Sequence, residues 1–255
     1  MREALRFAGD VVAVTVSLSS GRWQAAFTVD TGAPEPVKRE CETVGIDMGL
    51  TVLATLSDET RIRNPKALAA ALAELRSLDK AIARSRNTHG KKRPSRRRHR
   101  LYELRNRQHA RVRHLRRDHH HKATCAIAKT WAVVKVETLN VSGMVRNKRL
   151  ARSISDAGMA EFVRMLAYKC AWHGAQFVKV DPWFASSKTC SACGAVKAEL
   201  SLSERTYRCD GCGFECDRDL NAARNIQAYP VASSAAVKSA RRPGRTAGTT
   251  GRTGR

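Results

Sequence analysis

Four cysteines near the C-terminal end of the chain have the spacing of a metal site. Cys190 and Cys193 form one Cys-x-x-Cys pair, Cys209 and Cys212 form a second, and 15 residues separate the two pairs. Each short loop turns two sulfurs toward one point, so four thiolates at this spacing can hold one tetrahedral Zn²⁺ ion. Because four protein ligands leave no position for a water molecule, the pattern indicates a structural zinc site and not a catalytic one.

Acidic residues stand at the ends of three elements that the sequence predicts. Asp47 follows the apolar residues 44–46, Glu137 follows the apolar run 132–136, and Asp219 lies with Asp217 just before the helix-like run LNAARNIQ. Taken singly, each has an ordinary structural explanation as a turn aspartate or a helix cap. At one edge of a sheet, three carboxylates would form a cage of hard oxygens that suits Mg²⁺ or Mn²⁺. Two such ions activate water and stabilise the leaving oxygen in phosphodiester hydrolysis.

The charge balance indicates a polyanionic partner. The 255 residues include 47 Lys and Arg against 23 Asp and Glu, a formal net charge of +24. This excess argues against an enzyme of neutral metabolites and favours nucleic acid. Because no apolar run reaches the length of a membrane span and no signal peptide opens the chain, we expect no membrane partner. The cysteines outside the quartet are then reduced thiols of a cytosolic protein: Cys41, Cys125, Cys170 and Cys216.

Strands and helices are expected to alternate around the acidic residues. Residues 10–31 alternate in two runs around a Ser-Ser-Gly turn, which predicts a β-hairpin, and residues 32–36 read as a linker. Strands at 43–56, 132–137 and 176–180 predict a βββαβα-type sheet. Helical periodicity predicts helices from residue 65 onward, from about 96 to 129, and from 154 to 172, with a basic loop at 146–152. The composition after residue 228 predicts a disordered basic tail.

The two helices at about 65–129 are expected to form an antiparallel hairpin whose surface binds phosphate groups. Basic residues crowd between Arg84 and Lys122, with very few acids among them. Such a run is usually a solvated face, but its density and the net charge favour contact with nucleic acid. His119–His121 point in different directions on a helix, so we interpret them as solvated or phosphate-contacting. The candidate nucleic-acid contacts are Arg93, Arg96, Arg97, Arg98, Arg100, Arg105 and Arg107.

Five motifs occur together in this chain: VGIDMG (44–49), VETLNV (136–141), VDP (180–182), the four-cysteine knuckle and DRDLNAA (217–223). Over about residues 10–228 they resemble the RuvC-type nuclease core of the TnpB family, the OrfB proteins of insertion sequences, which are akin to type V CRISPR effectors. The resemblance implies an α/β, RNase H-like fold and an RNA-guided, metal-dependent DNA endonuclease, with DNA and a guide RNA as partners. The family's catalytic carboxylates fall on Asp47, Glu137 and Asp219, and its zinc ligands fall on the four cysteines. Asp217 is then a neighbour at the helix start.

The resemblance also implies a division of the chain. Residues 1–36 correspond to the end of an N-terminal β-barrel (wedge) domain, 37–186 to the nuclease core with the helical hairpin inserted at about 65–129, and 187–214 to the zinc knuckle. Residues 215–228 form the last nuclease segment, and 229–255 the basic tail. Family members carry an N-terminal recognition lobe for which we expect no counterpart here.

Two functions from different classes therefore stay open. The first is a metal-dependent nuclease of mobile-element origin, located in a prokaryotic cytoplasm and on the nucleoid when bound to DNA. The second is a zinc-stabilised nucleic-acid-binding remnant without guided cleavage. The complete set of three carboxylates favours the first, and the expected lack of the lobe favours the second. The sequence leaves the oligomeric state open.

Overall fold

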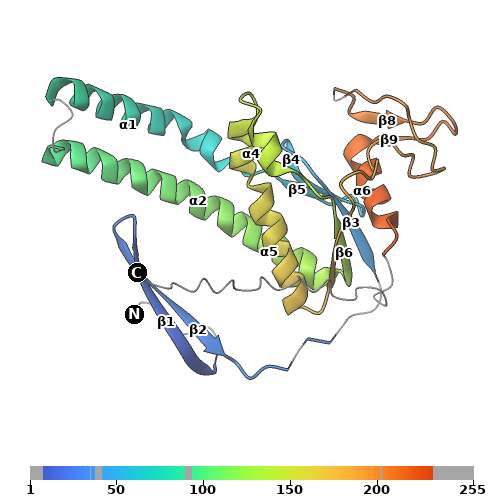
Figure 1. Cartoon of the computed structure of the whole chain (residues 1–255), viewed down its shortest axis with the longest axis horizontal. Helices are drawn as coiled ribbons and strands as arrows, with labels where there is room; N and C mark the ends of the chain where they lie inside the picture. Colours follow the sequence, from blue (N-terminus) through green and yellow to red (C-terminus); the bar gives the residue numbers. More distant parts are fainter. Residues whose placement is uncertain (1–7, 35, 38–41, 90–93, 202, 232–255) are drawn as a thin grey trace, which may run out of the picture.

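The computed structural model describes residues 8–34, 36–37, 42–89, 94–201 and 203–231, and the side chains of residues 87–89 are also left aside. Within these residues a mixed five-stranded sheet lies between helices (Figure 1). Its strand order is β5-β4-β3-β6-β7. The bounds are Arg61–Arg63 (β5), Val52–Leu56 (β4), Thr43–Met48 (β3), Val133–Val136 (β6) and Gln176–Lys179 (β7). The α/β class predicted from the sequence is confirmed.

Both kinds of strand pairing occur in this sheet. β3 pairs antiparallel with β4, which pairs antiparallel with β5. β3 also pairs parallel with β6, and β6 pairs parallel with β7. The short strand β5 was not predicted, because its sequence Arg-Ile-Arg is charged and holds a single apolar residue.

The two faces of the sheet have different coverings. Val44 and Ile46 of β3 and Val134 and Val136 of β6 join one apolar core with residues of α2 (Arg96–Thr130) and α5 (Met159–Trp172). Alternate residues of a strand point to opposite faces. Gly45 and Lys135 therefore face the other side, where both contact α6 (Arg218–Ala228). A Cβ atom on Gly45 would overlap the α6 backbone, so glycine permits the close approach of this helix.

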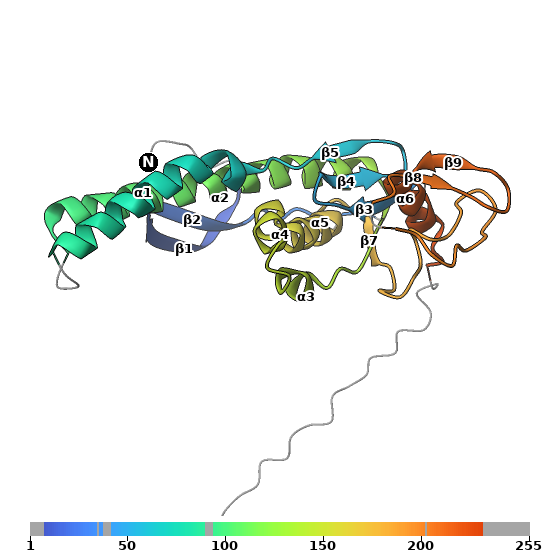
Figure 2. The ribbon, with the colours of Figure 1, turned by 90° about the horizontal axis from the view of Figure 1, so that it is seen from above.

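Helices α1 (Ala67–His89) and α2 form a long hairpin that extends away from the sheet (Figures 1 and 2). Alanine and leucine residues at helical spacing, among them Ala71 and Leu75, pack against Val112 of α2. The start of α1 is held by Asp156, whose two carboxylate oxygens accept hydrogen bonds from the N–H groups of Leu68 and Ala69. A carboxylate at a helix N-terminus satisfies donors that have no partner within the helix.

The single helix predicted at residues 154–172 is wrong, because the segment forms two helices. These are α4 (Ala151–Ala157) and α5, and Gly158 between them has φ +64°. A Cβ atom at Gly158 would lie 3.0 Å from His120 and from Arg116 of α2. Glycine at a left-handed helix end is therefore needed both for the backbone conformation and for the packing of α2. The basic loop predicted at 146–152 is also shorter than expected, since α4 begins at Ala151 and α3 (Val141–Val145) precedes it.

Two small β-structures complete the described chain. Strands β1 (Asp10–Ser19) and β2 (Arg22–Asp30) form the predicted N-terminal hairpin, whose turn lies beside α2 (Figure 2). Strands β8 (Thr206–Arg208) and β9 (Glu215–Asp217) pair at the C-terminal end of the cysteine knuckle, next to α6, and their bounds were not predicted. None of the described helices is both long and apolar enough to cross a membrane. Of the predicted tail, residues 232–255 lie outside the described residues.

Candidate metal centres and nucleic-acid interface

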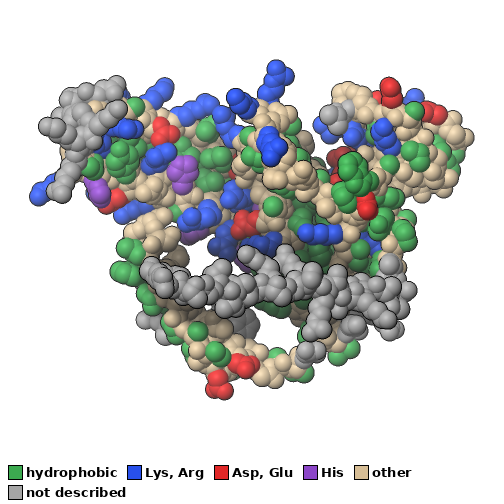
Figure 3. All heavy atoms as spheres, viewed as in Figure 1, with side chains coloured by type: hydrophobic (Ala, Val, Ile, Leu, Met, Phe, Trp, Pro, Cys, Tyr) green, Lys and Arg blue, Asp and Glu red, His purple; other side chains and the backbone are tan. Residues whose placement is uncertain are grey.

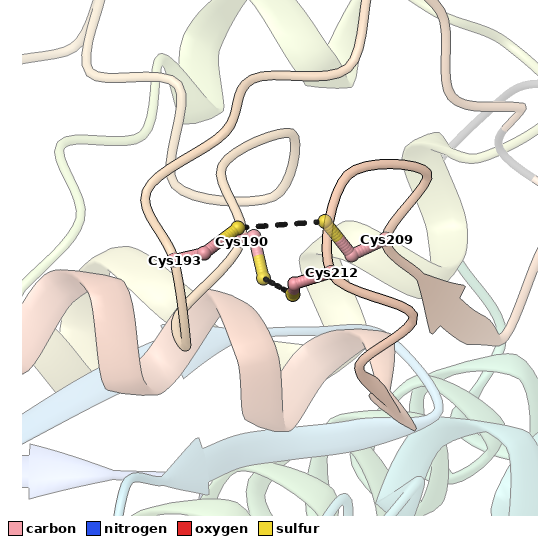
Figure 4. A group of neighbouring side chains, drawn as sticks. All are labelled: Cys190, Cys193, Cys209 and Cys212. Atoms are coloured by element: carbon pink, nitrogen blue, oxygen red, sulfur yellow. Dashed lines mark hydrogen bonds between the residues drawn. The ribbon is translucent and has the colours of Figure 1, made fainter.

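The four cysteines of the knuckle converge on one point (Figure 4). Their sulfur atoms all lie within 4.8 Å of one another, with 3.8 Å between the Sγ atoms of Cys190 and Cys212 and 3.6 Å between those of Cys193 and Cys209. Zn–S bonds of ~2.3 Å place the corners of a tetrahedron about 3.8 Å apart. Hydrogen bonds from the backbone N–H groups of Cys212 and Gly211 lower the pKa of Cys209 to about 6. Although a hydrogen bond from the N–H of Phe214 opposes the rise, the neighbouring thiols and burial raise the pKa of Cys212 to about 12. This donor set fits a closed zinc site.

Register in the parallel part of the sheet brings Asp47 and Glu137 together. Gly45 pairs with Lys135 and Ile46 with Val136, and Asp47 and Glu137 are the residues that directly follow this last pair. Residues two positions apart along a strand point to the same face, so Asp47 and Glu137 lie on the same side of the sheet as Gly45 and Lys135, the side that faces α6. The N–H of Met48 donates a hydrogen bond of 2.8 Å to Oε1 of Glu137, which fixes this carboxylate beside the end of β3.

The third carboxylate comes from α6. Asp217 is the N-cap of this helix, because its Oδ1 accepts hydrogen bonds from the N–H groups of Asp219 and Leu220 at 3.0 and 3.1 Å. Asp217 also forms an ion pair of 2.9 Å with Arg61 of β5. The sequence-based assignment of Asp217 to the helix start is confirmed, and Asp219 lies in the first turn of the helix.

The carboxylates act on one another electrostatically. Burial raises the pKa of Asp47 well above its ordinary value, and the charges of Glu137 and Asp219 raise it further. Burial also raises the pKa of Glu137 to about 7, with a smaller contribution from Asp219, although the Met48 hydrogen bond opposes the shift. A neighbouring like charge favours the protonated form of a carboxyl group, and a bound cation would favour the ionised form.

All three carboxylates line one cavity of about 730 Å³ beside the end of β3. Lys66, Arg205 and Arg218 line the same cavity. Within the described residues, the cysteine quartet is the one His/Cys/Asp/Glu group whose ligand atoms all lie within 4.8 Å of one another. The carboxylate oxygens of Asp47, Glu137 and Asp219 are therefore not all within 4.8 Å of one another.

Sequence reasoning missed the polar residues that hold these elements in place. Asn221 and Asn225 of α6 bond the backbone of the knuckle, and Nζ of Lys135 donates to the carbonyl groups of Gln227 and Tyr229 at the end of α6. Their partners are main-chain atoms of distant segments, which no spacing rule identifies. A signal was present for Asn221 and Asn225 alone, since their i, i+4 spacing places both on one helix face.

The predicted phosphate-contacting arginines divide into three groups. Exposed side chains belong to Arg96, Arg97, Arg100 and Arg107, and Arg105 is half-buried and forms an ion pair of 2.9 Å with Asp79. Arg98 is 3% exposed, so its side chain is not on the surface. Arg93 lies outside the described residues. Figure 3 shows Lys and Arg side chains distributed over α1, α2 and α4.

The interpretation of the three histidines is wrong for His120. Its ring is fully buried and packs edge-on against Phe162 of α5, with 5.5 Å between the ring centroids. Burial lowers the pKa of His120 to about 4, so the ring is neutral at pH 7. The apolar spacing of α2 did not include this residue, because histidine was read as polar.

Two family models match the chain. The model described as "Probable transposase" (OrfB_IS605) matches residues 26–148, and the model "Cas12f1-like, TNB domain" matches residues 160–226. Their matched ranges contain Asp47, Glu137 and Asp219 as well as the four cysteines.

Curated relatives match most of the chain. Two of them carry the name "Putative RNA-guided DNA endonuclease": one from Streptomyces pristinaespiralis is 40% identical over 94% of this chain, and InsQ from Escherichia coli (strain K12) is 34% identical over 89%. The chain spans 58% of the length of each. Among solved structures, a CRISPR-Cas12f ternary complex matches 80% of this chain and 42% of its own chain, with a TM-score of 0.55 and 20% identity. This last likeness is one of fold.

Proposed function

The chain belongs to the TnpB/OrfB family, and from this premise we propose that it is a transposon-associated DNA endonuclease that depends on divalent metal ions. The observation that carries the proposal is the cavity beside β3. Asp47, Glu137 and Asp219 come from segments far apart in the sequence, line this one cavity and interact through their charges. Relatives that carry the name of RNA-guided DNA endonuclease support the same activity.

We assign the sheet to the RNase H-like (RuvC) type. Three antiparallel strands followed by two parallel strands, in the order β5-β4-β3-β6-β7, support this assignment. In this interpretation residues 37–186 and 215–228 form the nuclease core, the helical hairpin at about 65–129 is an insertion, and 187–214 form a zinc knuckle. The hairpin β1–β2 belongs to a wedge-type β-domain.

The residues of the cavity have separate roles in phosphodiester hydrolysis. Asp47, Glu137 and Asp219 would hold Mg²⁺ or Mn²⁺, since hard carboxylate oxygens suit these ions. Bound ions of this kind supply an activated water and stabilise the leaving oxygen. Oε1 of Glu137 accepts the Met48 N–H bond, which would hold this carboxylate in a fixed orientation toward a bound cation. The N-cap bond from Asp217 fixes the first turn of α6 and with it the backbone of Asp219.

Cationic side chains on the cavity wall would bind the scissile strand. Lys66 has a left-handed backbone conformation, φ +46°, within a turn in which its N–H bonds Oδ1 of Asn64. Asn64 in turn donates to the carbonyl of Leu50, beside the end of β3. Non-glycine residues rarely adopt this conformation, and they do so only where the surrounding structure holds them in it. We therefore assign Lys66, with Arg205, to phosphate groups that flank the scissile bond.

The helical hairpin would supply contacts to the nucleic-acid backbone outside the cavity. Exposed arginines along α2 carry charge without a pattern suited to base edges, so they position the nucleic acid and do not read its sequence. A cleft of about 790 Å³ lies between the turn of β1–β2 and the helical hairpin α1–α2. Arg22, Arg107 and Arg111 are among the residues that line it. The proposed partners are DNA and a guide RNA.

The proposal is tested by cleavage of single-stranded DNA in Mn²⁺ or Mg²⁺. Asp47→Ala, Glu137→Gln and Asp219→Asn should each lower the cleavage rate by several orders of magnitude, because losing one ligand disrupts the whole site. Asp217→Asn is the matched control. It keeps an oxygen that can cap α6, so it should cost far less than Asp219→Asn, its neighbour two residues away.

Nucleic-acid binding should survive all four substitutions, because affinity comes mainly from the basic surface. If the parent chain cleaves and Asp47→Ala cleaves equally well, the assignment to this cavity is wrong. If the parent chain binds DNA but does not cleave it, even when joined to the portion of the Streptomyces relative that it does not span, the zinc-stabilised binding protein is the correct function.

A further inference from the structure

Two buried asparagines connect the helix of Asp219 with the cysteine knuckle. Asn221 donates a hydrogen bond of 2.7 Å to the carbonyl of Thr189 and accepts one of 2.9 Å from the N–H of Ser191. Asn225 donates to the carbonyl groups of Ser186 and Thr189, at 2.7 and 2.6 Å. Asn221 is fully buried and Asn225 is 6% exposed. All four bonds end on residues 186–191, the segment that carries Cys190.

Helix geometry places these asparagines opposite the carboxylate. Each residue of an α-helix advances about 100° around the axis, so Asn221 and Asn225 share one face and Asp219 lies about 160° away from Asn221. One face of α6 therefore contacts the knuckle while the opposite side carries Asp219 to the cavity. A rotation or shift of the helix relative to the knuckle would displace the Asp219 carboxylate.

The two ends of α6 are held by different parts of the molecule. The C-terminal end is tied to the sheet, where Lys135 bonds the carbonyl groups of Gln227 and Tyr229, and Gln227 bonds the carbonyl of Thr43. The N-terminal end is tied to the knuckle and, through the ion pair of Asp217 with Arg61, to β5. The N–H of Arg218 donates to the carbonyl of Arg205 at 2.8 Å, and its guanidinium donates to the carbonyl of Ser201 at 2.9 Å.

The knuckle has little core of its own to hold this end. Its buried cluster consists of Cys190, Tyr207 and Cys209, with Leu200 and Phe214 packed against it. Small metal-binding units of this kind depend on their ion for order. Loss of zinc should therefore free residues 186–191 from a fixed position, and the asparagines would pass this change to α6.

We propose that Asn221 and Asn225 are positioning residues that make the geometry of Asp219 depend on zinc occupancy of the knuckle. Through them, a filled zinc site holds the third carboxylate where it completes the divalent-metal site, and an empty one releases it. The part of this inference that concerns the divalent-metal site rests on the proposed function. The coupling itself concerns the protein alone and is tested separately.

Hydrogen exchange of the full chain tests the coupling without any catalytic metal. Removing zinc from the parent should raise the exchange rates of amides 219–223 at least tenfold. Asn225→Leu and the milder Asn221→Ser should show raised rates while zinc remains bound, and zinc removal should add little further. Gln227→Leu is the matched control, because it also removes an amide-to-carbonyl bond of α6, but one that ends on β3. It should leave amides 219–223 at their parent rates. If either variant does not fold, the other decides.

Binding of Mn²⁺ then tests the consequence for the carboxylate site. Zinc removal and the Asn225→Leu substitution should each weaken Mn²⁺ binding about tenfold, and the two effects should not add, because they act through the same contact. Saturating Mn²⁺ should restore cleavage to Asn225→Leu but not to Asp219→Asn. A merely structural role for the asparagines predicts additive effects.

The two proposals fail in different ways. A parent chain that binds no Mn²⁺ contradicts the proposed function, yet the exchange measurement still decides the coupling. Exchange rates of amides 219–223 that do not respond to zinc removal, or that respond equally in the parent and both asparagine variants, overturn the coupling whatever the metal does.

Discussion

Asp47 lies on β3 and Glu137 directly follows the neighbouring parallel strand β6, and their charges are unfavourable together when no cation is bound. Burial raises the pKa of both groups, that of Glu137 to about 7. The folded chain therefore binds more protons than the unfolded chain between the ordinary carboxyl pKa and about 7. Stability must then fall as pH rises through this window, because stability decreases wherever the native state binds more protons.

The expected fall in stability with rising pH can be measured. In buffer free of Mg²⁺ and Mn²⁺, the free energy of unfolding should fall between about pH 5 and pH 8. Glu137→Gln should remove roughly 2 kcal/mol of that fall, since one pKa unit corresponds to about 1.4 kcal/mol. Urea unfolding at a series of pH values measures the difference.

Glu199→Gln is the matched control, because this carboxylate is exposed in the knuckle. It should follow the parent curve at every pH. Addition of Mn²⁺ should restore the stability of the parent at pH 8 and leave Glu137→Gln nearly unchanged. A parent that becomes more stable relative to Glu137→Gln as pH rises would contradict the electrostatic description of the site.

The helical hairpin is the element whose surface charge is expected to determine nucleic-acid affinity. Neutralising Arg96, Arg97 and Arg100 together should reduce the dependence of log affinity on log salt by about 2 to 3 for a DNA duplex, at about 0.9 for each lost phosphate contact. Arg98 is left intact, because its side chain is buried. Filter binding at a series of salt concentrations gives the slope.

Two single substitutions on α2 provide the comparison. Arg100 is exposed, whereas Arg105 already forms an ion pair with Asp79. Arg105→Ala should therefore change the salt dependence less than Arg100→Ala. A triple variant with the parent slope would exclude this face of the hairpin from the interface.

At the level of elements, regular periodicity was sufficient for the long helices and the apolar strands. The range predicted for the second helix, about 96–129, agrees closely with α2, and the N-terminal hairpin has the expected turn. Prediction failed where tertiary contact decides the structure. The break at Gly158 depends on the approach of His120 and Arg116, and β5, β8 and β9 are too short to show a period.

At the level of the whole molecule, the cavity is an acidic site in a strongly basic protein. The net charge of +24 would attract a nucleic acid to the surface, whereas Asp47, Glu137 and Asp219 line the cavity beside β3, as does Asp156, whose oxygens cap α1. The cationic side chains of Lys66 and Arg205 line the wall of the same cavity. Such an arrangement suits the binding of a phosphate chain whose scissile bond must lie against metal ions.

The candidate site residues could be identified from the sequence, but their supporting contacts could not. Cysteine spacing identified the knuckle, and strand ends together with the family resemblance indicated Asp47, Glu137 and Asp219. The bonds of Asn221, Asn225 and Lys135 end on main-chain atoms of other segments. Such partners depend on how the elements pack, which residue types alone do not specify.

The central claim is that the three carboxylates form a divalent-metal site. The most direct test is anomalous diffraction at the manganese edge from crystals of the full chain soaked in Mn²⁺, with zinc at the cysteine quartet as an internal control. We expect two manganese peaks about 3.5 to 4 Å apart within reach of Asp47, Glu137 and Asp219, and none in crystals of Asp47→Ala. A zinc peak at the cysteines with no manganese in the cavity of the parent chain would contradict it.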